Sequence, residues 1–228
     1  MKRSDVNKAI IWSKEFFERE HISLPAFAYW SKEEWTANKD KTEMIKHLML
    51  GWDITDFGMN DFYNLGCVLF TLRNGDQKDS SKGVPYAEKY ILCKEGQRLP
   101  LHYHVSKTED IINRAGGNMY LYLRNADPKT GELIDTDVEV WMDGILRTFK
   151  PMEEIVVTPG NSITLKPFVA HIFGAKKGHG DLLAGEVSAV NDDNTDNYFK
   201  EPVARFSEIE EDESILHPLC NEYEKFSL

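Results

Sequence analysis

The amino-acid sequence predicts a mainly β fold, in which short strands form a barrel or sandwich and helices flank it at both ends of the chain. From about residue 53 to residue 190, short apolar runs alternate with turn residues at a spacing of roughly 8–12 residues, which is typical of all-β domains. Before this stretch apolar residues follow helical spacing, and after it a helix-capping pattern returns. The middle of the chain therefore differs from both ends.

The length of the chain fits a single domain. Its 228 residues include 41% apolar and 29% charged side chains, close to the usage of ordinary globular proteins. We expect one domain over residues 1–228, because single β-barrels and sandwiches often exceed about 200 residues. It would comprise a helical N-terminal extension (1–52), the β-barrel (53–190) and a C-terminal segment (191–228) that packs on the barrel.

Charge and cysteine content disfavour several classes of protein. The formal net charge of −11 argues against a nucleic-acid partner or an anionic membrane surface. Acidic residues between 208 and 213 are interpreted as a solvated helix face. The three cysteines lie far apart and do not form the pattern of a disulfide framework. With no signal-peptide run and no apolar stretch long enough to cross a membrane, we expect a cytoplasmic protein.

Three capping patterns predict the helices. The first helix is expected to begin near Ser4, and the apolar stripe that follows it includes Phe16 and Phe17. Ser31 and Glu34 form the capping-box pattern of a second helix. Ser207, followed three residues later by Glu210, predicts a further helix in the C-terminal segment.

The predicted strands are short and bounded by turn chemistry. One pair of strands is joined at Asp143 and Gly144, a dipeptide that favours a tight hairpin. The strands are expected at Cys67–Leu72, Lys89–Cys93, Met119–Leu123, Val138–Met142, Ile145–Phe149, Ile155–Val157, Ser162–Leu165, Ala170–Phe173 and Leu182–Val190. Cys67 and Cys93 lie in apolar runs and are interpreted as core residues.

The sequence contains a concentrated set of potential metal ligands. His102 and His104 stand two residues apart, and on a strand two such side chains point to the same face. Glu109 follows five residues later, beyond a turn, and can add a carboxylate oxygen. A divalent cation that accepts both imidazole and carboxylate could bind all three side chains.

This segment resembles the first motif of the cupin superfamily. That motif reads Gly, five residues, His-x-His, three or four residues, Glu, six residues, Gly, and here Gly96, His102, His104, Glu109 and Gly116 meet every position. The resemblance implies a cupin-type β-barrel, also called a jelly roll, with flanking N-terminal and C-terminal helices. It also implies that the barrel encloses one metal ion.

The second cupin motif is met only in part. Gly160, Pro167 and His171 resemble its Gly, Pro and His, although the proline falls one residue closer to the histidine than the motif has it. The second glycine and the terminal Asn are missing. The resemblance still implies His171 as the fourth ligand, and three histidines with one glutamate leave two positions open on an octahedral metal. Mn²⁺, Fe²⁺, Co²⁺, Ni²⁺ and Zn²⁺ all suit such ligands.

Across nearly the full chain, the pattern resembles the D-lyxose isomerase family. The resemblance rests on the aromatic N-terminal helix, His102-Tyr-His104, Lys107, Glu109-Asp110, His171, and a tail with Asp192-Asp193-Asn, Glu201-Pro and Arg205-Phe. It implies an enzyme of carbohydrate metabolism that interconverts D-lyxose with D-xylulose and D-mannose with D-fructose. It further implies Mn²⁺ as cofactor, a small-molecule sugar as partner and a homodimer.

The same resemblance implies roles for five further residues. Aldose–ketose isomerisation moves a proton between C1 and C2, which needs a base and a group that handles the proton on oxygen. The resemblance implies Glu201 as the base and Lys107 as its proton-handling partner. Asp193 and Arg205 would orient sugar hydroxyls, with Glu186 assisting.

Three alternatives remain open at this point. A non-haem iron dioxygenase of the cupin type uses a comparable set of ligands. A cupin phosphosugar isomerase would gather Arg, Lys, Ser and Thr near the site, whereas the tail after residue 185 is rich in Asp and Glu. A non-catalytic sugar-binding module is the third alternative.

Overall fold

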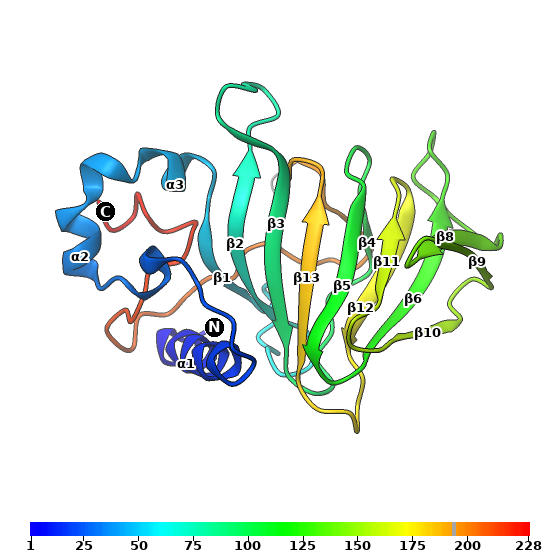
Figure 1. The fold of residues 1–228 in the computed structure, drawn as a ribbon, viewed down its shortest axis with the longest axis horizontal. Helices are drawn as coiled ribbons and strands as arrows, with labels where there is room; N and C mark the ends of the chain where they lie inside the picture. Colours follow the sequence, from blue (N-terminus) through cyan, green and yellow to red (C-terminus); the bar gives the residue numbers. More distant parts are fainter. Residues whose placement is uncertain (193–194) are drawn as a thin grey trace.

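The protein, here a computed structural model that describes residues 1–192 and 195–228, consists mainly of two curved β-sheets (Figure 1). The larger sheet has eight strands in the order β1-β2-β3-β13-β5-β11-β8-β9 among the described residues. Their bounds are β1 Gly51–Thr55, β2 Cys67–Gly75, β3 Gly83–Cys93, β13 Leu182–Ser188, β5 Glu109–Gly116, β11 Ser162–Leu165, β8 Val138–Met142 and β9 Ile145–Phe149.

The second sheet faces the first and carries the histidine strand β4. Its order is β10-β6-β12-β4-β14, with the short β7 pairing with β6. The bounds are β10 Glu154–Val157, β6 Met119–Ala126, β12 Val169–Ala175, β4 His102–Tyr103, β14 Tyr198–Phe199 and β7 Leu133–Ile134. The strands that pair are antiparallel in both sheets.

One apolar core lies between the two sheets. Ile91 and Ile111 of the larger sheet and Leu121 and Phe173 of the smaller sheet belong to the same buried cluster. Side chains alternate between the two faces of a strand, so each strand sends every second residue into this core. The mainly β, jelly-roll prediction is therefore confirmed.

The N-terminal helix covers the outer face of the larger sheet. Helix α1 (Arg3–Arg19) contacts β1 and β2, and Figure 1 shows it beside that end of the sheet. Ile10 and Phe17 of α1 join Trp52 of β1 and Phe70 of β2 in a second buried cluster. This packing explains the helical stripe in the sequence, because most of its apolar residues are buried on the side of the helix that faces the sheet.

Short helical segments follow α1. They are η1 (Ala26–Tyr29), α2 (Lys32–Ala37), η2 (Lys39–Lys41) and α3 (Glu43–His47). The capping box of α2 is confirmed, since the Ser31 hydroxyl accepts a hydrogen bond from the Glu34 amide and the Glu34 carboxylate accepts one from the Ser31 amide. The cap expected at Ser4 is wrong, because α1 begins one residue earlier and the Ser4 hydroxyl donates instead to Asp212.

The C-terminal helix predicted from Ser207 is also wrong. The described residues after β14 contain turns and bends but no helix. The Ser207 hydroxyl binds Asp56 instead of capping a helix, and Glu211 and Glu222 bind the buried guanidinium of Arg3. The prediction of a solvated helix face for residues 208–213 is therefore wrong in part, because Glu211 and Asp212 attach the C-terminal segment to the start of α1.

Two strands that matter for function do not stand out in the sequence. Strand β5 begins at Glu109 and carries Asn113 and Arg114, so polar residues interrupt its apolar pattern. Strand β14 lies beyond residue 190, where the predicted barrel ends, and pairs with β4 next to His102. The C-terminal segment therefore adds a strand to the sheet that holds the histidines.

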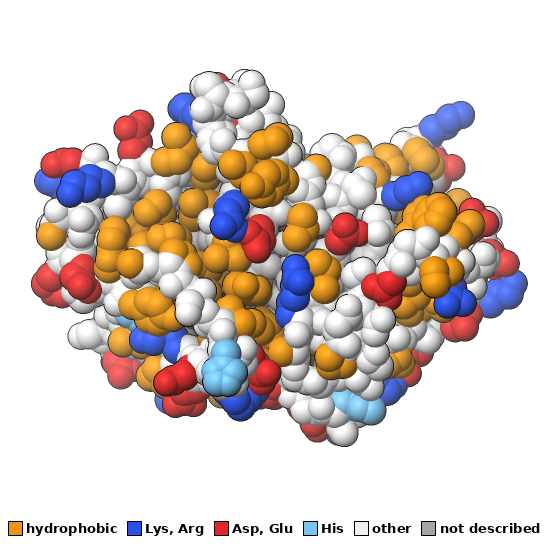
Figure 2. Space-filling model, viewed as in Figure 1, with side chains coloured by type: hydrophobic (Ala, Val, Ile, Leu, Met, Phe, Trp, Pro, Cys, Tyr) orange, Lys and Arg blue, Asp and Glu red, His pale blue; other side chains and the backbone are white. Residues whose placement is uncertain are grey.

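The surface of the protein carries mixed charge. On the face in Figure 2, acidic and basic side chains are interspersed among apolar ones, which is not the continuous basic field that a nucleic-acid surface presents. Among the described residues, no helix is both long enough and apolar enough to span a membrane.

Candidate metal centre and active site

Three histidines converge in the interior, between the two sheets. His102 lies on β4 and is paired in register with His171 on the neighbouring β12, while His104 follows at the end of β4. All three side chains are buried, and each offers a ring nitrogen within 4.8 Å of the others. The predicted metal ligands His102, His104 and His171 are thus brought together by two adjacent antiparallel strands.

The hydrogen bonds of the histidines fix which ring nitrogen faces the centre. Nδ1 of His102 lies 2.9 Å from the Pro100 carbonyl, and Nδ1 of His171 lies 3.0 Å from the Val169 carbonyl. Nδ1 of His104 contacts the carbonyl of Asp196. A carbonyl oxygen can only accept, so each Nδ1 carries the proton and each Nε2 keeps a free lone pair. This is the tautomer that a metal-binding imidazole needs.

Glu109 completes a set of donors that fits a cation. Its Oε1 lies 3.2 Å from Nε2 of His171 and 3.5 Å from Nε2 of His104. Neither this oxygen nor Nε2 of His171 has a hydrogen-bond partner among the described residues, and both are buried. Two lone pairs that face each other away from water are unfavourable unless a cation or proton lies between them. Three imidazoles and one carboxylate therefore fit a divalent metal ion.

The charges at the centre favour the metal-binding protonation states. Burial lowers the pKa of His102 well below its usual value and also lowers the pKa of His171. For Glu109, burial raises the pKa, but the charges of Lys107 and His104 lower it by more. The pKa of Glu109 therefore lies well below its usual value. Neutral imidazoles and an ionised carboxylate are the forms that bind metal.

Lys107 connects Glu109 to a second carboxylate. Its ammonium lies 2.8 Å from Oε2 of Glu109 and 2.9 Å from Oε1 of Glu186, and it donates to the amide oxygen of Asn191 at 3.3 Å. The Lys107 side chain is only 4% exposed, so it is not a surface lysine.

Glu186 is held between two lysines. It lies on β13, where its Oε1 also accepts a hydrogen bond from the Ser188 hydroxyl and is 3.8 Å from the ammonium of Lys89 on β3. Burial raises the pKa of Glu186, whereas Lys107 and Lys89 lower it more, and the net shift is downward. Glu186 is therefore an ionised carboxylate in the interior, with its charge balanced by neighbouring cations.

These groups line one shared cavity. Polar groups occupy one part of its wall and Phe57, Phe173 and Phe199 another. The polar lining consists of Lys89, His102, His104, Lys107, Glu109, His171, Glu186, Asn197 and Arg205. A cavity with convergent polar groups on an apolar wall suits a small polar ligand with a carbon backbone.

Arg205 lies in this cavity, as its predicted role requires. Its guanidinium donates to Asp53 of β1 at 2.5 Å, and its charge is thereby balanced. Asp193 lies outside the described residues, so its predicted contact with a sugar stays a prediction.

Glu201 is not brought into the cavity lining. Its carboxylate accepts hydrogen bonds from the guanidinium of Arg98 at 3.0 and 3.1 Å and from the amide of Leu101 at 2.9 Å. The pKa of Glu201 is lowered, and the hydrogen bond from Arg98 is the largest cause of this shift. Both polar oxygens are thus already engaged, and the role of Glu201 as the base stays a prediction that this geometry does not favour.

Lys89 and Asp196 are site residues that the sequence reasoning missed. A usable signal existed for Lys89, because strand alternation places it on the same face as Ile91 and Cys93, both core residues. Asp196 had no such signal. Asp196 contacts His104 and the amide of Val105, which lie about ninety positions earlier in the chain. No local sequence pattern predicts contacts over such a separation.

Comparison with known proteins finds relatives along almost the whole chain. A sequence profile of the D-lyxose isomerase family matches residues 1–223. A protein of Serratia proteamaculans named D-lyxose/D-mannose isomerase is 44% identical over 227 residues, which is 99% of both chains. A protein of the same name from Escherichia coli O157:H7 is 43% identical over 231 residues, or 99% of this chain and 100% of its own.

The fold also matches solved structures of low sequence identity. L-ribose isomerase from Acinetobacter sp. DL28, solved in complex with L-ribose, superposes with a TM-score of 0.64 at 14% identity, over 92% of this chain and 98% of its own. L-ribose isomerase from Geodermatophilus obscurus superposes with a TM-score of 0.59 at 14% identity over the same shares. With the family profile covering nearly every residue and relatives identical at more than two positions in five, the chain belongs to the D-lyxose isomerase family of aldose–ketose sugar isomerases.

Proposed function

We propose that the protein is a metal-dependent isomerase that interconverts D-lyxose with D-xylulose, and D-mannose with D-fructose. The observation that carries the proposal is the pair of buried lone pairs on Glu109 and His171, next to the Lys107–Glu186 ion pair. The two facing lone pairs favour a bound cation. The Lys107–Glu186 ion pair contains a carboxylate and an ammonium that can move a proton. The names of the two most similar relatives described above support the choice of sugars.

The metal, which we propose to be Mn²⁺, would be held by His102, His104, Glu109 and His171. When bound, it would supply a Lewis acid that polarises the sugar carbonyl. Co²⁺, Ni²⁺, Zn²⁺ and Fe²⁺ also suit these ligands.

We propose Glu186, in place of Glu201, as the base that moves the proton between carbons. Glu186 is ionised, lines the same cavity as the histidines, and belongs to the interior. In the direction from aldose to ketose, it would remove the proton from C2, giving an enediol, and return that proton to C1. Because the base returns the proton that it takes, the reaction needs no oxidant or reductant.

Lys107 would handle the proton that moves between the two sugar oxygens. As the O2 hydroxyl becomes the ketose carbonyl, its proton must leave, and O1 must gain one. An ammonium that already bridges Glu109 and Glu186 can stabilise negative charge that develops on oxygen at this position. Arg205 and Asp193 would orient the hydroxyls at the far end of the sugar.

The balance of charge in the cavity favours a neutral sugar over a phosphosugar. Lys89 and Lys107 face Glu186, and Arg205 is bound to Asp53. A phosphate dianion would need cations that are not already matched by carboxylates. We therefore propose free aldoses as substrates. Separately, we propose a homodimer as the assembly, and the elution volume in gel filtration would check it.

The proposal predicts that metal-stripped protein is inactive and that Mn²⁺ restores conversion of D-lyxose to D-xylulose. The assay would compare D-lyxose, D-mannose and mannose 6-phosphate, each with stripped and reloaded protein. Oxygen uptake with Fe²⁺-loaded protein would be recorded in parallel. Turnover of the phosphosugar alone, or oxygen uptake without any isomerisation, would contradict the proposal.

A further inference from the structure

The three ligand histidines differ in what orients them. Nδ1 of His102 and Nδ1 of His171 each bind the carbonyl of the residue two positions earlier in the chain. Nδ1 of His104 binds the carbonyl of Asp196, which lies in the C-terminal segment. Two ligands are thus oriented locally by their own strands, whereas the third depends on a residue far away in the sequence.

The Asp196 side chain binds the loop that carries His104 and Lys107. One carboxylate oxygen accepts from the Val105 amide at 2.7 Å, and the other accepts from the Lys107 amide at 3.0 Å and from the Ser106 hydroxyl at 2.7 Å. Asp196 is 6% exposed. Its main chain therefore holds a metal ligand, while its side chain holds the backbone on both sides of Ser106.

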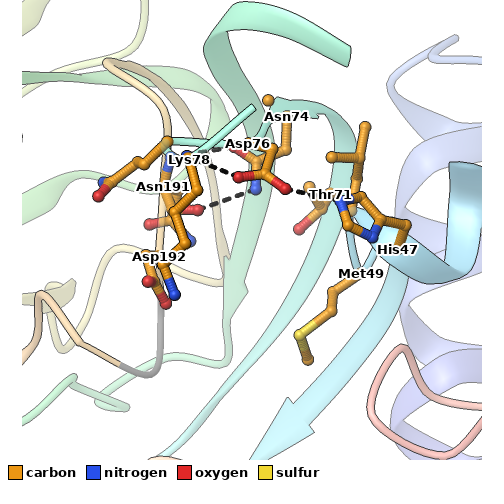
Figure 3. A pocket seen from close by; sticks show the side chains of 11 residues that line it. His47, Met49, Thr71, Asn74, Asp76, Lys78, Asn191 and Asp192 are labelled. Carbon is orange, nitrogen blue, oxygen red and sulfur yellow. Dashed lines mark hydrogen bonds and ion pairs between the residues drawn. The ribbon is translucent and has the colours of Figure 1, made fainter. Parts of the chain in front are cut away.

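The start of the same segment is fixed independently, by Asn191. The amide of Asn191 donates to the side-chain oxygen of Asn74 on β2, and the side chain of Asn74 donates back to the Asn191 carbonyl, both at 2.9 Å. Figure 3 shows the two residues close together among the side chains that line a pocket. The side chain of Asn191 then receives the bond from Lys107. The segment therefore contacts the His104–Lys107 loop at two points.

We propose that Asp196 is a positioning residue that sets the orientation of His104 and of Lys107 together. The inference rests on the proposed function only in that the site binds a divalent metal. Only Val105 and Ser106 separate the two functional side chains, so this loop can shift as a unit. The carboxylate removes that freedom by accepting hydrogen bonds from three consecutive backbone amides, those of residues 105–107. Outer partners of metal-binding histidines typically change metal affinity or activity by about 10–100-fold when removed.

A purely structural role for Asp196 predicts something different. In that case its loss would lower the unfolding temperature without changing metal affinity. Asp79 provides a matched control, because its carboxylate accepts hydrogen bonds from both the amide and the hydroxyl of Ser81 in the β2–β3 loop. It reproduces the contact between Asp196 and Ser106 in a turn that does not line the cavity.

The test measures Mn²⁺ affinity of the metal-stripped full chain by calorimetric titration, together with its unfolding temperature. For Asp196→Ala we expect Mn²⁺ to bind about 10–100-fold more weakly, and Asp196→Asn, which keeps one acceptor oxygen, to recover part of that loss. Asp79→Ala should leave Mn²⁺ affinity unchanged. At saturating Mn²⁺ we also expect kcat of Asp196→Ala to stay low, because Lys107 loses the same support.

Mn²⁺ affinity in Asp196→Ala equal to that of the wild type would overturn the proposal, even if the unfolding temperature falls. Should Asp196→Ala fail to fold, Asp196→Asn and Ser106→Ala carry the test, and unchanged affinity in both would overturn it equally. If the wild-type protein itself binds no Mn²⁺, the proposed metal site is wrong as well, so the two failures are distinguishable.

Discussion

Glu186→Gln is expected to lower kcat for D-lyxose by about 10²–10⁴-fold, the usual contribution of a general base. The amide cannot accept the C2 proton, yet its oxygen can still accept the hydrogen bond from Lys107. Glu186 is not among the proposed metal ligands, so Mn²⁺ should remain bound. The measurement is steady-state kinetics at saturating Mn²⁺, with the metal content of each variant determined alongside.

Glu201→Gln is the matched comparison for this variant. Glu201 is partly exposed and paired with Arg98, and exposed ion pairs contribute only about 0–1 kcal/mol. We therefore expect kcat close to that of the wild type. If Glu201→Gln instead loses activity while Glu186→Gln retains it, Glu201 is the base and our assignment is wrong.

His171→Ala is expected to abolish both metal binding and isomerisation. The side chain is 1% exposed and its Nε2 faces Oε1 of Glu109, so the substitution removes one of the four proposed ligands from the interior. Without it, Glu109 keeps a buried, ionised oxygen that has lost one partner for the shared cation. Mn²⁺ affinity should fall by more than the roughly 10–100-fold typical of outer partners.

The control for this variant is His47→Ala. His47 binds Asp76 at 2.7 Å and lies in the surface hollow of Figure 3, away from the three ligand histidines. We expect it to retain metal and activity. Full activity in His171→Ala, with Mn²⁺ still bound, would remove His171 from the ligand set.

The sequence was sufficient for the parts of the site that depend on local spacing. His102 and His104 share a face because strand side chains alternate, and the glycine-bounded motif specified Glu109 as their companion. His171 came from a weaker motif, yet it lies opposite His102 in the neighbouring strand. The mainly β fold followed from short apolar runs separated by turns.

The remainder of the site depends on contacts between distant segments. Glu201 looked like a base by family resemblance, but its role is disfavoured by Arg98, a residue that no local pattern links to it. Glu186 was expected only to assist, since its two lysine partners come from another strand and a loop. The C-terminal helix was predicted from Ser207, whose hydroxyl is used by Asp56 instead. In each case a polar contact between segments distant in sequence decides what the residue does.

The central claim is that the sugar lies with C1 and C2 between the histidine cluster and Glu186. A crystal structure of Glu186→Gln with Mn²⁺ and D-xylulose would test it most directly, since this variant should bind sugar without turning it over. We predict Mn²⁺ bound by His102, His104, Glu109 and His171, with residue 186 within hydrogen-bonding reach of C1 and C2, about 3 Å. Mn²⁺ at other residues, or a sugar whose C1 and C2 lie beside Glu201, would contradict the account.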